Sequence, residues 1–413
     1  MDNFSLPESL SFLLEELSIA GLPKSIAERS DFLPSLILGT ENVDSLTGTE
    51  DRDYIFGLAG DDTIAGLGGN DFLFSGEGNN TVRGGDGRDR IYGKSGADLL
   101  FGDAGDDRFR DVSGGNEIDG GEGRDTINYR NIDEAISLRV NIEPNLFTDE
   151  EDESGLRIER EGVEPDKISN IERIIAPEGQ ANAIDFQAAF FGPPFSGENR
   201  RAPNIKVNLA EGTLTTGAVS GVFDGETTTV DNFVDVTGSL GDDVIVGSEA
   251  NNNLDGLIGS NRLEGAGGDD FLSTFERDTL IGGSGRDTFS LKAADKRIGS
   301  FIGPFPPPID PLEGSKILDF QTGTDKIQLN REGEGVQFDT GLSFAFDGFE
   351  ALPIGELDES MFSILGSGEA ASSASISYDT STGDLFYNIG DNSNKVATLQ
   401  GAPTLSASDI FVV

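Results

Sequence analysis

The stretch RGGDGRDRIYGKSGADLLFGDAGDDRF, residues 83–109, combines tight glycine pairs with acidic and apolar residues at a fixed interval. Asp89, Asp98 and Asp107 lie nine residues apart, and an apolar residue follows each of them two positions later. Such strict spacing indicates a structural repeat of nine residues, and a repeat is the first feature to establish in any sequence.

The same unit runs in unbroken register through residues 44–127. Its apolar positions are Leu46, Ile55, Ile64, Leu73, Val82, Ile91, Leu100, Phe109, Ile118 and Ile127. Two residues before each lies Asp44, Asp53, Asp62, Asp71, Asn80, Asp89, Asp98, Asp107, Asn116 or Asp125. Chance does not produce ten such units, so we expect one repetitive fold over this segment.

A second, less regular array follows. Its apolar positions are Ile245, Leu254, Leu263, Leu272, Leu280 and Phe289. The preceding polar positions are Asp243, Asn252, Asn261, Asp270, Asp278 and Asp287. One unit is a residue short and two lack the aspartate, so this array is the weaker prediction.

The composition limits the chemistry open to this chain. There are 75 acidic and 29 basic residues, a formal net charge of −46. Such a chain repels nucleic acid and anionic membrane surfaces and attracts multivalent cations. Cysteine is absent, which excludes disulfides and thiolate metal sites. Histidine is absent too, which removes the commonest general base and the usual zinc ligand.

The opening stretch MDNFSLPESLSFLLEELSIAG predicts a short amphipathic helix. The sequence SLPE at 5–8 forms a capping-box pattern, and the leucines between positions 10 and 17 fall on one face. No basic segment precedes them, so we expect no N-terminal secretory signal. Membrane insertion is the alternative, disfavoured because the polar face carries glutamates. No apolar run reaches the ~18 residues that a spanning helix needs.

Outside the arrays the sequence indicates further strands. ISLRVNI (136–142) and IKVNL (205–209) alternate apolar and polar residues, as half-buried strands do. After the second array, KILDF, DKIQL, SISYD and DLFYNI predict the strands of a C-terminal β cap.

The glycines and carboxylates of the repeat favour calcium. Glycine permits positive φ and close backbone approach, so that carbonyl oxygens can point toward one centre. The aspartate adds charge to that centre. Calcium takes six to eight oxygen ligands from carboxylates and carbonyls, whereas magnesium demands a stricter octahedron and keeps its waters.

Nine residues make half a coil, and two units complete one turn, which stacks alternate units at the strand spacing of ~4.8 Å. One edge would then carry Asp53, Asp71, Asp89, Asp107 and Asp125. The opposite edge would carry Asp44, Asp62, Asn80, Asp98 and Asn116. An asparagine oxygen ligates calcium without formal charge, so we expect the first edge to bind more strongly.

The two arrays resemble the calcium-binding nonapeptides of the repeats-in-toxin (RTX) family, closely over 39–127 and with gaps over 238–289. ILDFQTGTDKIQL (317–329) is similar to the cap strand after such rolls. DKISNIERII (166–175) is similar to segments between arrays in RTX exoproteins, cyanobacterial ones among them. The closing DIFVV resembles the tail of type I secretion substrates.

The resemblance implies an all-β fold, a parallel β-roll or right-handed β solenoid of nonapeptide repeats, that binds several Ca2+ ions. The candidate aspartate ligands are Asp53, Asp62, Asp71, Asp89, Asp98, Asp107, Asp125, Asp243, Asp270, Asp278 and Asp287. The candidate glycine positions are Gly60, Gly69, Gly78, Gly87, Gly96, Gly105 and Gly123. For any one of these aspartates, the alternative to a calcium ligand is an ordinary polar turn residue. The weaker pattern of the second array favours that alternative more than the first array does.

We expect five segments along the chain. They are an N-terminal helical cap (1–37), a first β-roll (38–130), a β-rich linker (131–236), a second β-roll (237–291), and a C-terminal β cap with a type I secretion signal (292–413).

The function expected from these features is that of a secreted calcium-binding protein with a structural or adhesive role at the cell surface or in the extracellular matrix. Without histidine, neither a zinc protease motif nor a histidine-assisted triad is possible, and no nucleophile elbow occurs, so we expect no enzyme. The alternatives are a hemolysin-like cytolysin or a carbohydrate-active exoenzyme that uses paired carboxylates. Expected partners are calcium, the type I secretion machinery, and a cell-surface polysaccharide or another surface protein, with no nucleic acid and no membrane span.

Overall fold

The computed structural model describes residues 36–110, 112, 114–141, 155–186, 204–216, 227–239, 241–274, 277–292, 314–330, 336–337, 343–344, 349, 352–366, 374–389 and 392–413. These residues form strands joined by turns, with two 3-10 turns, η4 (Glu359–Met361) and η5 (Ala407–Asp409), so the all-β prediction is confirmed. The helix predicted within residues 1–37 lies outside the described residues, except for the last two of that range, which form a strand.

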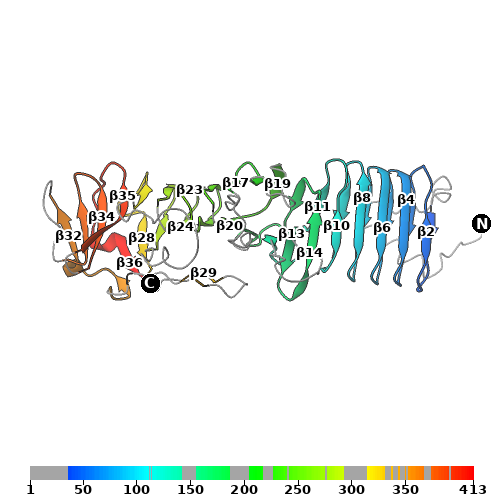
Figure 1. The fold of residues 1–413 in the computed structure, drawn as a ribbon, viewed down its shortest axis with the longest axis horizontal. Coiled ribbons are helices and arrows are strands. Elements are labelled where there is room, and N and C mark those ends of the chain that lie inside the picture. Colours follow the sequence, from blue (N-terminus) through cyan, green and yellow to red (C-terminus); the bar gives the residue numbers. More distant parts are fainter. Residues whose placement is uncertain are drawn as a thin grey trace, which may run out of the picture. The chain divides into compact units, whose positions relative to one another are not determined.

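The chain divides into two units, residues 1–128 and 129–413. In the first unit, alternate strands join two parallel sheets, and the successive coils lie side by side in Figure 1. The first sheet contains β1 (Leu36–Leu38), β3 (Tyr54–Phe56), β5 (Phe72–Phe74), β7 (Arg90–Tyr92), β9 (Arg108–Arg110) and β11 (Thr126–Asn128). The second contains β2 (Ser45–Thr47), β4 (Thr63–Gly69), β6 (Thr81–Gly87), β8 (Leu99–Ala104) and β10 (Glu117–Asp119).

The register confirms the predicted coil of two nonapeptides. Ile55 lies opposite Leu73 in one sheet, and Ile64 lies opposite Val82 in the other, so that each partner is two repeat units further along the chain. The strands of the first sheet are three residues long. Those of the second extend to as many as seven, because there the pairing continues into the glycine turns, as between Gly69 and Gly87.

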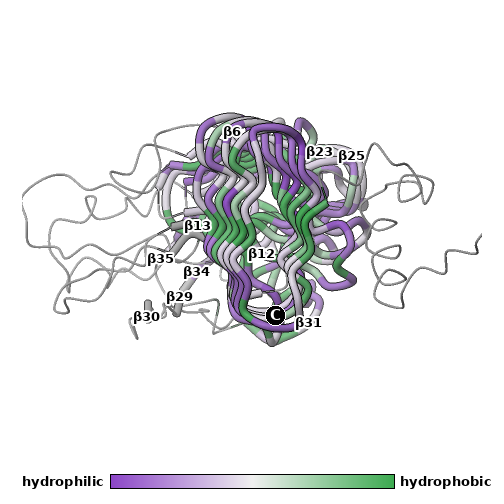
Figure 2. Tube along the Cα trace, turned by 90° about the vertical axis from the view of Figure 1, so that its right-hand side faces the viewer, coloured by the Kyte–Doolittle hydropathy of each residue, from purple (hydrophilic) through white to green (hydrophobic). Residues whose placement is uncertain are grey.

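The core of the first unit is a thin double row of the predicted apolar residues. From Ile55 to Ile127 each of them is at most 1% exposed. Viewed along the stack, the apolar positions form rows inside the coils, and the turns are polar (Figure 2). One apolar side chain for every nine residues is a small core, so the turns must contribute much of the stability.

The outer side of the first sheet also carries aromatic residues. Tyr54 stacks on Phe72 with ring centroids 4.8 Å apart, and Phe56, Phe74 and Tyr92 form a second stack with spacings of 4.5 and 4.4 Å. The spacing is that of neighbouring strands, so each coil adds one ring to the column. All five rings are buried.

The second unit is also built on two sheets. One contains β15 (Arg173–Ile175), β17 (Ile205–Asn208), β18 (Thr213–Thr216), β19 (Thr227–Asp231), β21 (Val244–Ser248), β23 (Arg262–Gly267), β25 (Thr279–Ser284), β27 (Ser315–Ile317), β32 (Phe362–Leu365), β33 (Ile376–Asp379), β34 (Asp384–Ile389) and β35 (Asn392–Leu399). The other contains β12 (Ser137–Asn141), β13 (Gly155–Arg160), β14 (Val163–Ser169), β16 (Ala183–Asp185), β20 (Asp235–Thr237), β22 (Asn253–Asp255), β24 (Phe271–Thr274), β26 (Thr288–Leu291), β28 (Lys326–Leu329), β31 (Gly355–Glu356) and β36 (Ile410–Val412). A separate hairpin joins β29 (Val336–Gln337) and β30 (Ser343–Phe344).

Strands from the linker and from the cap extend the second roll in parallel register. Ile184 of β16 aligns with Val236, which aligns with Leu254 of the second array. At the other end, Ile327 of β28 aligns with both Phe289 and Ile410. The same ladder of buried apolar residues therefore runs through segments with and without the nonapeptide pattern.

The short unit of the second array does not break the ladder. Leu263 pairs with Leu280, although the segment between them falls one residue short of two full units, and the parallel pairing of β23 with β25 continues on both sides. The missing residue therefore falls between β24 and β25, where chain length can change without shifting the strands.

Candidate metal centre

From Asp62 to Asp125, each repeat aspartate of the first unit uses one carboxylate oxygen to bind the neighbouring coil. Oδ1 of Asp71, Asp89 and Asp107 accepts a hydrogen bond from the backbone N–H of the repeat residue one coil earlier, at 2.7–2.8 Å. The opposite edge repeats the arrangement, with Asp98 accepting from Asn80. The side chains therefore form two stacked columns, as the nine-residue spacing predicted.

The second carboxylate oxygen of several of these aspartates is buried without a hydrogen-bond donor among the described residues. The aspartates concerned are Asp62, Asp71, Asp89, Asp107, Asp270 and Asp287. All six are predicted ligands, and each is at most 2% exposed. A buried carboxylate oxygen without a donor is costly, so each of these positions calls for a positive group.

Backbone carbonyl oxygens converge on the same places. A Cβ added to Gly66 would collide with Oδ2 of Asp71 and with the carbonyl oxygen of Gly84 on the next coil. Gly84 has the equivalent neighbours, Asp89 and Gly102, at 2.4 and 2.6 Å from such a Cβ. Two kinds of oxygen acceptor thus face one small space that only glycine leaves open.

This donor set fits calcium. Within the described ranges no three acidic side chains gather closely enough to hold a metal by themselves. The sites must therefore combine carboxylates with the backbone carbonyls of adjacent coils, which is a mixture that calcium accepts readily. One ion would satisfy the orphan carboxylate oxygen and the carbonyls together.

The predicted glycine ligands have the backbone conformation that the repeat requires. Gly78, Gly87 and Gly105 have φ values of 115°, 141° and 138°. A Cβ on Gly87 would meet the carbonyl oxygen of Gly69 far inside van der Waals contact, and the same holds for Gly105 with Gly87. Larger residues are excluded there by both backbone strain and the neighbouring coil.

In other predicted ligands the second oxygen, Oδ2, already has a protein donor. Oδ2 of Asp53 accepts from the Thr49 backbone N–H and hydroxyl at 2.6 and 2.9 Å. Oδ2 of Asp243 accepts from the backbone of Ser239, and a hydroxyl contacts Oδ2 of both Asp98 and Asp278. These aspartates therefore need a cation less than the six with an orphan oxygen.

Where asparagine replaces aspartate, the amide nitrogen takes the place of a cation. Nδ2 of Asn80 donates to the carbonyl of Gly78 at 3.1 Å, and Nδ2 of Asn252 donates to that of Val234 at 2.7 Å. Oδ1 of Asn80 keeps the coil-to-coil bond of the aspartates. The hydrogen bonds of the amide group, including one from Nδ2 of Asn80 to Oδ1 of Asp98 at 3.1 Å, thus hold an asparagine step.

Two members of the columns lie outside the predicted arrays. Oδ1 of Asp325 in the cap accepts from Asp287 at 3.1 Å, and Oδ1 of Asn182 in the linker accepts from Ile136 at 3.0 Å. The sequence could have indicated Asp325, because GTDKI (323–327) matches the glycine, aspartate and apolar positions at the end of the repeat. Asn182 shares only the buried isoleucine two residues later. The glycines five residues before each aspartate, Gly66 among them, were also missed as parts of the site.

Burial raises the pKa of the metal-free carboxyl groups. The pKa of Asp71 is raised to about 7, that of Asp89 to about 6 and that of Asp107 to about 8, in each case chiefly by desolvation. Charge repulsion from the next aspartate in the column raises the pKa of Asp71 and Asp107 further. In the absence of calcium, ionised aspartates therefore oppose the coiled state.

We expect acid to replace part of the effect of calcium. Because these pKa values are raised on folding, the metal-free roll binds more protons than the unfolded chain, and its stability falls as the pH rises from about 4 to about 8. In excess chelator, the far-ultraviolet β signal should be stronger at about pH 5.5 than at about pH 8. A chelated protein whose signal increases with pH would contradict this expectation.

The fold and these turns define a parallel β-roll with oxygen sites for a hard cation between its coils. Residues 38–73, 74–109, 111–128, 237–272 and 274–291 match the family described as RTX calcium-binding nonapeptide repeat (4 copies). The two arrays therefore carry RTX-type calcium-binding repeats, as their spacing predicted. No curated protein matches it, so the resemblance of 166–175 to cyanobacterial exoproteins stays a prediction.

Proposed function

We propose that this protein is secreted and acts as a calcium-dependent structural or adhesive component at the cell surface or in the extracellular matrix. The observation that carries the proposal is the column of buried carboxylates with orphan oxygens, at Asp71, Asp89 and Asp107. Such a column is stable only where calcium is plentiful, because metal binding and folding are coupled.

The same property suits export through a narrow channel. A calcium-poor cytosol would leave the chain unfolded and able to pass a type I secretion machine, and folding would follow outside. The strongly negative charge, −46, keeps the unfolded chain soluble on the way.

We assign no catalytic activity to the protein. The chain has no histidine, and the buried aspartates of the roll are engaged in coil-to-coil hydrogen bonds. The cytolysin alternative is a membrane activity. Among the described residues, the structure contains no helix with the length and apolar character needed to cross a membrane.

Purified protein added to live cells, with and without calcium, tests the proposal. We expect it to remain on the cells in calcium and to be released by chelator, while the cells stay intact. Leakage of cell contents in calcium would favour the cytolysin, and the absence of any retention would contradict an adhesive role.

Deletion of residues 350–413 is expected to abolish export by a type I machine. The expectation rests on the resemblance of the C-terminal segment to such secretion signals. A matched deletion of residues 39–127, which removes the first array but leaves this segment intact, should still be exported. Normal export of the C-terminal deletion would refute the placement of the signal.

A further inference from the structure

The first sheet of the first unit differs in charge from the rest of the chain. None of its six strands contains an aspartate or glutamate. Its outward positions change along the stack from aromatic residues to arginines, since Phe72 aligns with Arg90, and Arg90 with Arg108. A face with arginines and no carboxylate is unexpected in a chain with a net charge of −46.

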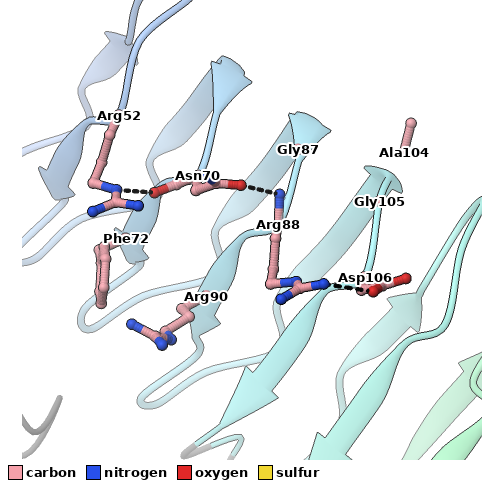
Figure 3. A pocket seen from close by; sticks show the side chains of 9 residues that line it. All are labelled: Arg52, Asn70, Phe72, Gly87, Arg88, Arg90, Ala104, Gly105 and Asp106. Carbon is pink, nitrogen blue, oxygen red and sulfur yellow. Dashed lines mark hydrogen bonds and ion pairs between the residues drawn. The ribbon is translucent and has the colours of Figure 1, made fainter.

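A hollow of about 730 Å³, within the range of small-ligand sites, lies at the edge of this face, where Phe72 and Arg90 meet the ends of β6 and β8 at Gly87 and Ala104. Arg52, Arg88 and Arg90 line it together with Asn70 and Asp106 (Figure 3). Figure 3 shows Arg52 and Arg90 directed to the same space on either side of Phe72. The guanidinium of Arg90 lies over the Phe72 ring at 4.7 Å from its centroid, and this contact holds its orientation.

Arg88 pairs with Asp106 at 2.7 Å, and the charge of Arg52 partly offsets the burial that raises the pKa of Asp71, but neither Arg52 nor Arg90 has a carboxylate partner of its own among the described residues. Within the part of the chain that the structure describes, no carboxylate forms an ion pair with Arg52, Arg90 or Arg108. Arg52 donates only through Nε, to the carbonyl of Asn70 at 3.1 Å. By contrast Arg83, on the other sheet, is paired with Asp103 at 2.8 Å. The terminal guanidinium nitrogens of Arg52 and the guanidinium of Arg90 therefore form no ion pair with a described carboxylate and can bind an external anion.

The hollow favours an anion of moderate charge density. Asp106, which pairs with Arg88 at 2.7 Å, places a carboxylate at its rim and would repel a densely charged polymer such as nucleic acid. The aromatic rings nearby are buried, so they offer no platform on which bases could stack. Asn70 and Asp106 are instead suited to sugar hydroxyls, and Arg90 and Arg108 repeat a positive charge at the ~4.8 Å strand step.

We propose that this arginine hollow binds a linear acidic polysaccharide, through its carboxylate or sulfate groups. The inference deepens the proposed adhesive function and rests on it. It also makes binding depend on calcium, because Arg52, Arg90 and Arg108 come together only when four successive coils, those of β3, β5, β7 and β9, are folded.

Electrophoresis of the full chain in millimolar calcium, through gels that contain polygalacturonate, heparin or neutral dextran, tests the inference. We expect retardation in one or both acidic gels and none in dextran. The double variant Arg52→Gln/Arg90→Gln should bind about tenfold more weakly, since two charge-assisted contacts are lost. The control Arg83→Gln/Arg286→Gln has the same net charge, and it should bind as the parent chain does.

Circular dichroism and calcium stoichiometry identify variants that still fold. Equal retardation of the two folded double variants would overturn the inference, because calcium bridging between polyanions would act on both alike. Retardation by polyglutamate but by neither glycan would overturn it in favour of an acidic peptide. If the Arg52→Gln/Arg90→Gln variant still adheres to cells, the adhesive function stands and this site is wrong.

Discussion

Chelation of calcium is expected to remove more than about half of the far-ultraviolet β signal at neutral pH. In the first unit the stacked carboxylates of Asp71, Asp89 and Asp107 would lose the ions that satisfy their orphan oxygens. The inner rows supply one apolar side chain per nine residues, and even with the five buried aromatic rings this core is too thin to compensate for that loss.

The two units should respond differently. In the second unit Asn252 and Asn261 hold their steps through amide hydrogen bonds, and Asp243 has protein donors for both oxygens. We therefore expect residues 241–261 to keep more protection from hydrogen exchange in chelator than residues 62–107. Calcium titration followed by circular dichroism, with magnesium as the control ion, measures the first effect. An unchanged β signal in excess chelator would show that the roll folds without metal.

Asp89→Ala is expected to remove about two calcium ions and to destabilise the first unit by about 3 kcal/mol or more. The substitution removes the orphan oxygen beside Gly84 and leaves the buried backbone N–H of Asp71 without its acceptor. The two ions concerned are those shared with Asp71 and with Asp107. Because each coil contacts mainly its neighbours, the damage should first spread locally.

Two matched substitutions separate charge from hydrogen bonding. Asp89→Asn keeps an acceptor for the Asp71 N–H and should lose calcium with less loss of structure. Asn80→Ala removes only neutral hydrogen bonds and the contact with Asp98, and should leave calcium stoichiometry nearly unchanged. Isothermal calorimetry on the three variants compares them. If Asn80→Ala lowers stoichiometry or affinity as much as Asp89→Ala, the distinction between a strong and a weak edge is wrong.

The nonapeptide pattern was enough to predict the coil, because all of its determinants are local. A glycine turn, one aspartate and one apolar residue recur every nine residues. Two such units form one coil, and coils of equal length stack in register. That is why the pairing of Asp71 with Asp89, and of Ile64 with Val82, followed from spacing alone.

The strands contributed by the linker and the cap could not be placed in this way. Leu138 aligns with Ile184, and Ile184 with Val236, across segments that are unequal in length and far longer than two nonapeptides, so the insertions hide the period. After each insertion the chain returns to the same ladder, which only the pairing in three dimensions reveals.

By itself the sequence determined the repeat, the two columns of carboxylates and the preference for calcium, since each depends on residue type and spacing. Only the tertiary structure decided which carboxylates keep an orphan oxygen. Oδ2 of Asp98 accepts a hydrogen bond from the hydroxyl of Ser75 on a neighbouring coil, so this oxygen needs no cation. Oδ2 of Asp107 has no such donor among the described residues. The arginine hollow has the same origin, because Arg52, Arg88 and Arg90 are distributed over coils that meet only when the chain folds.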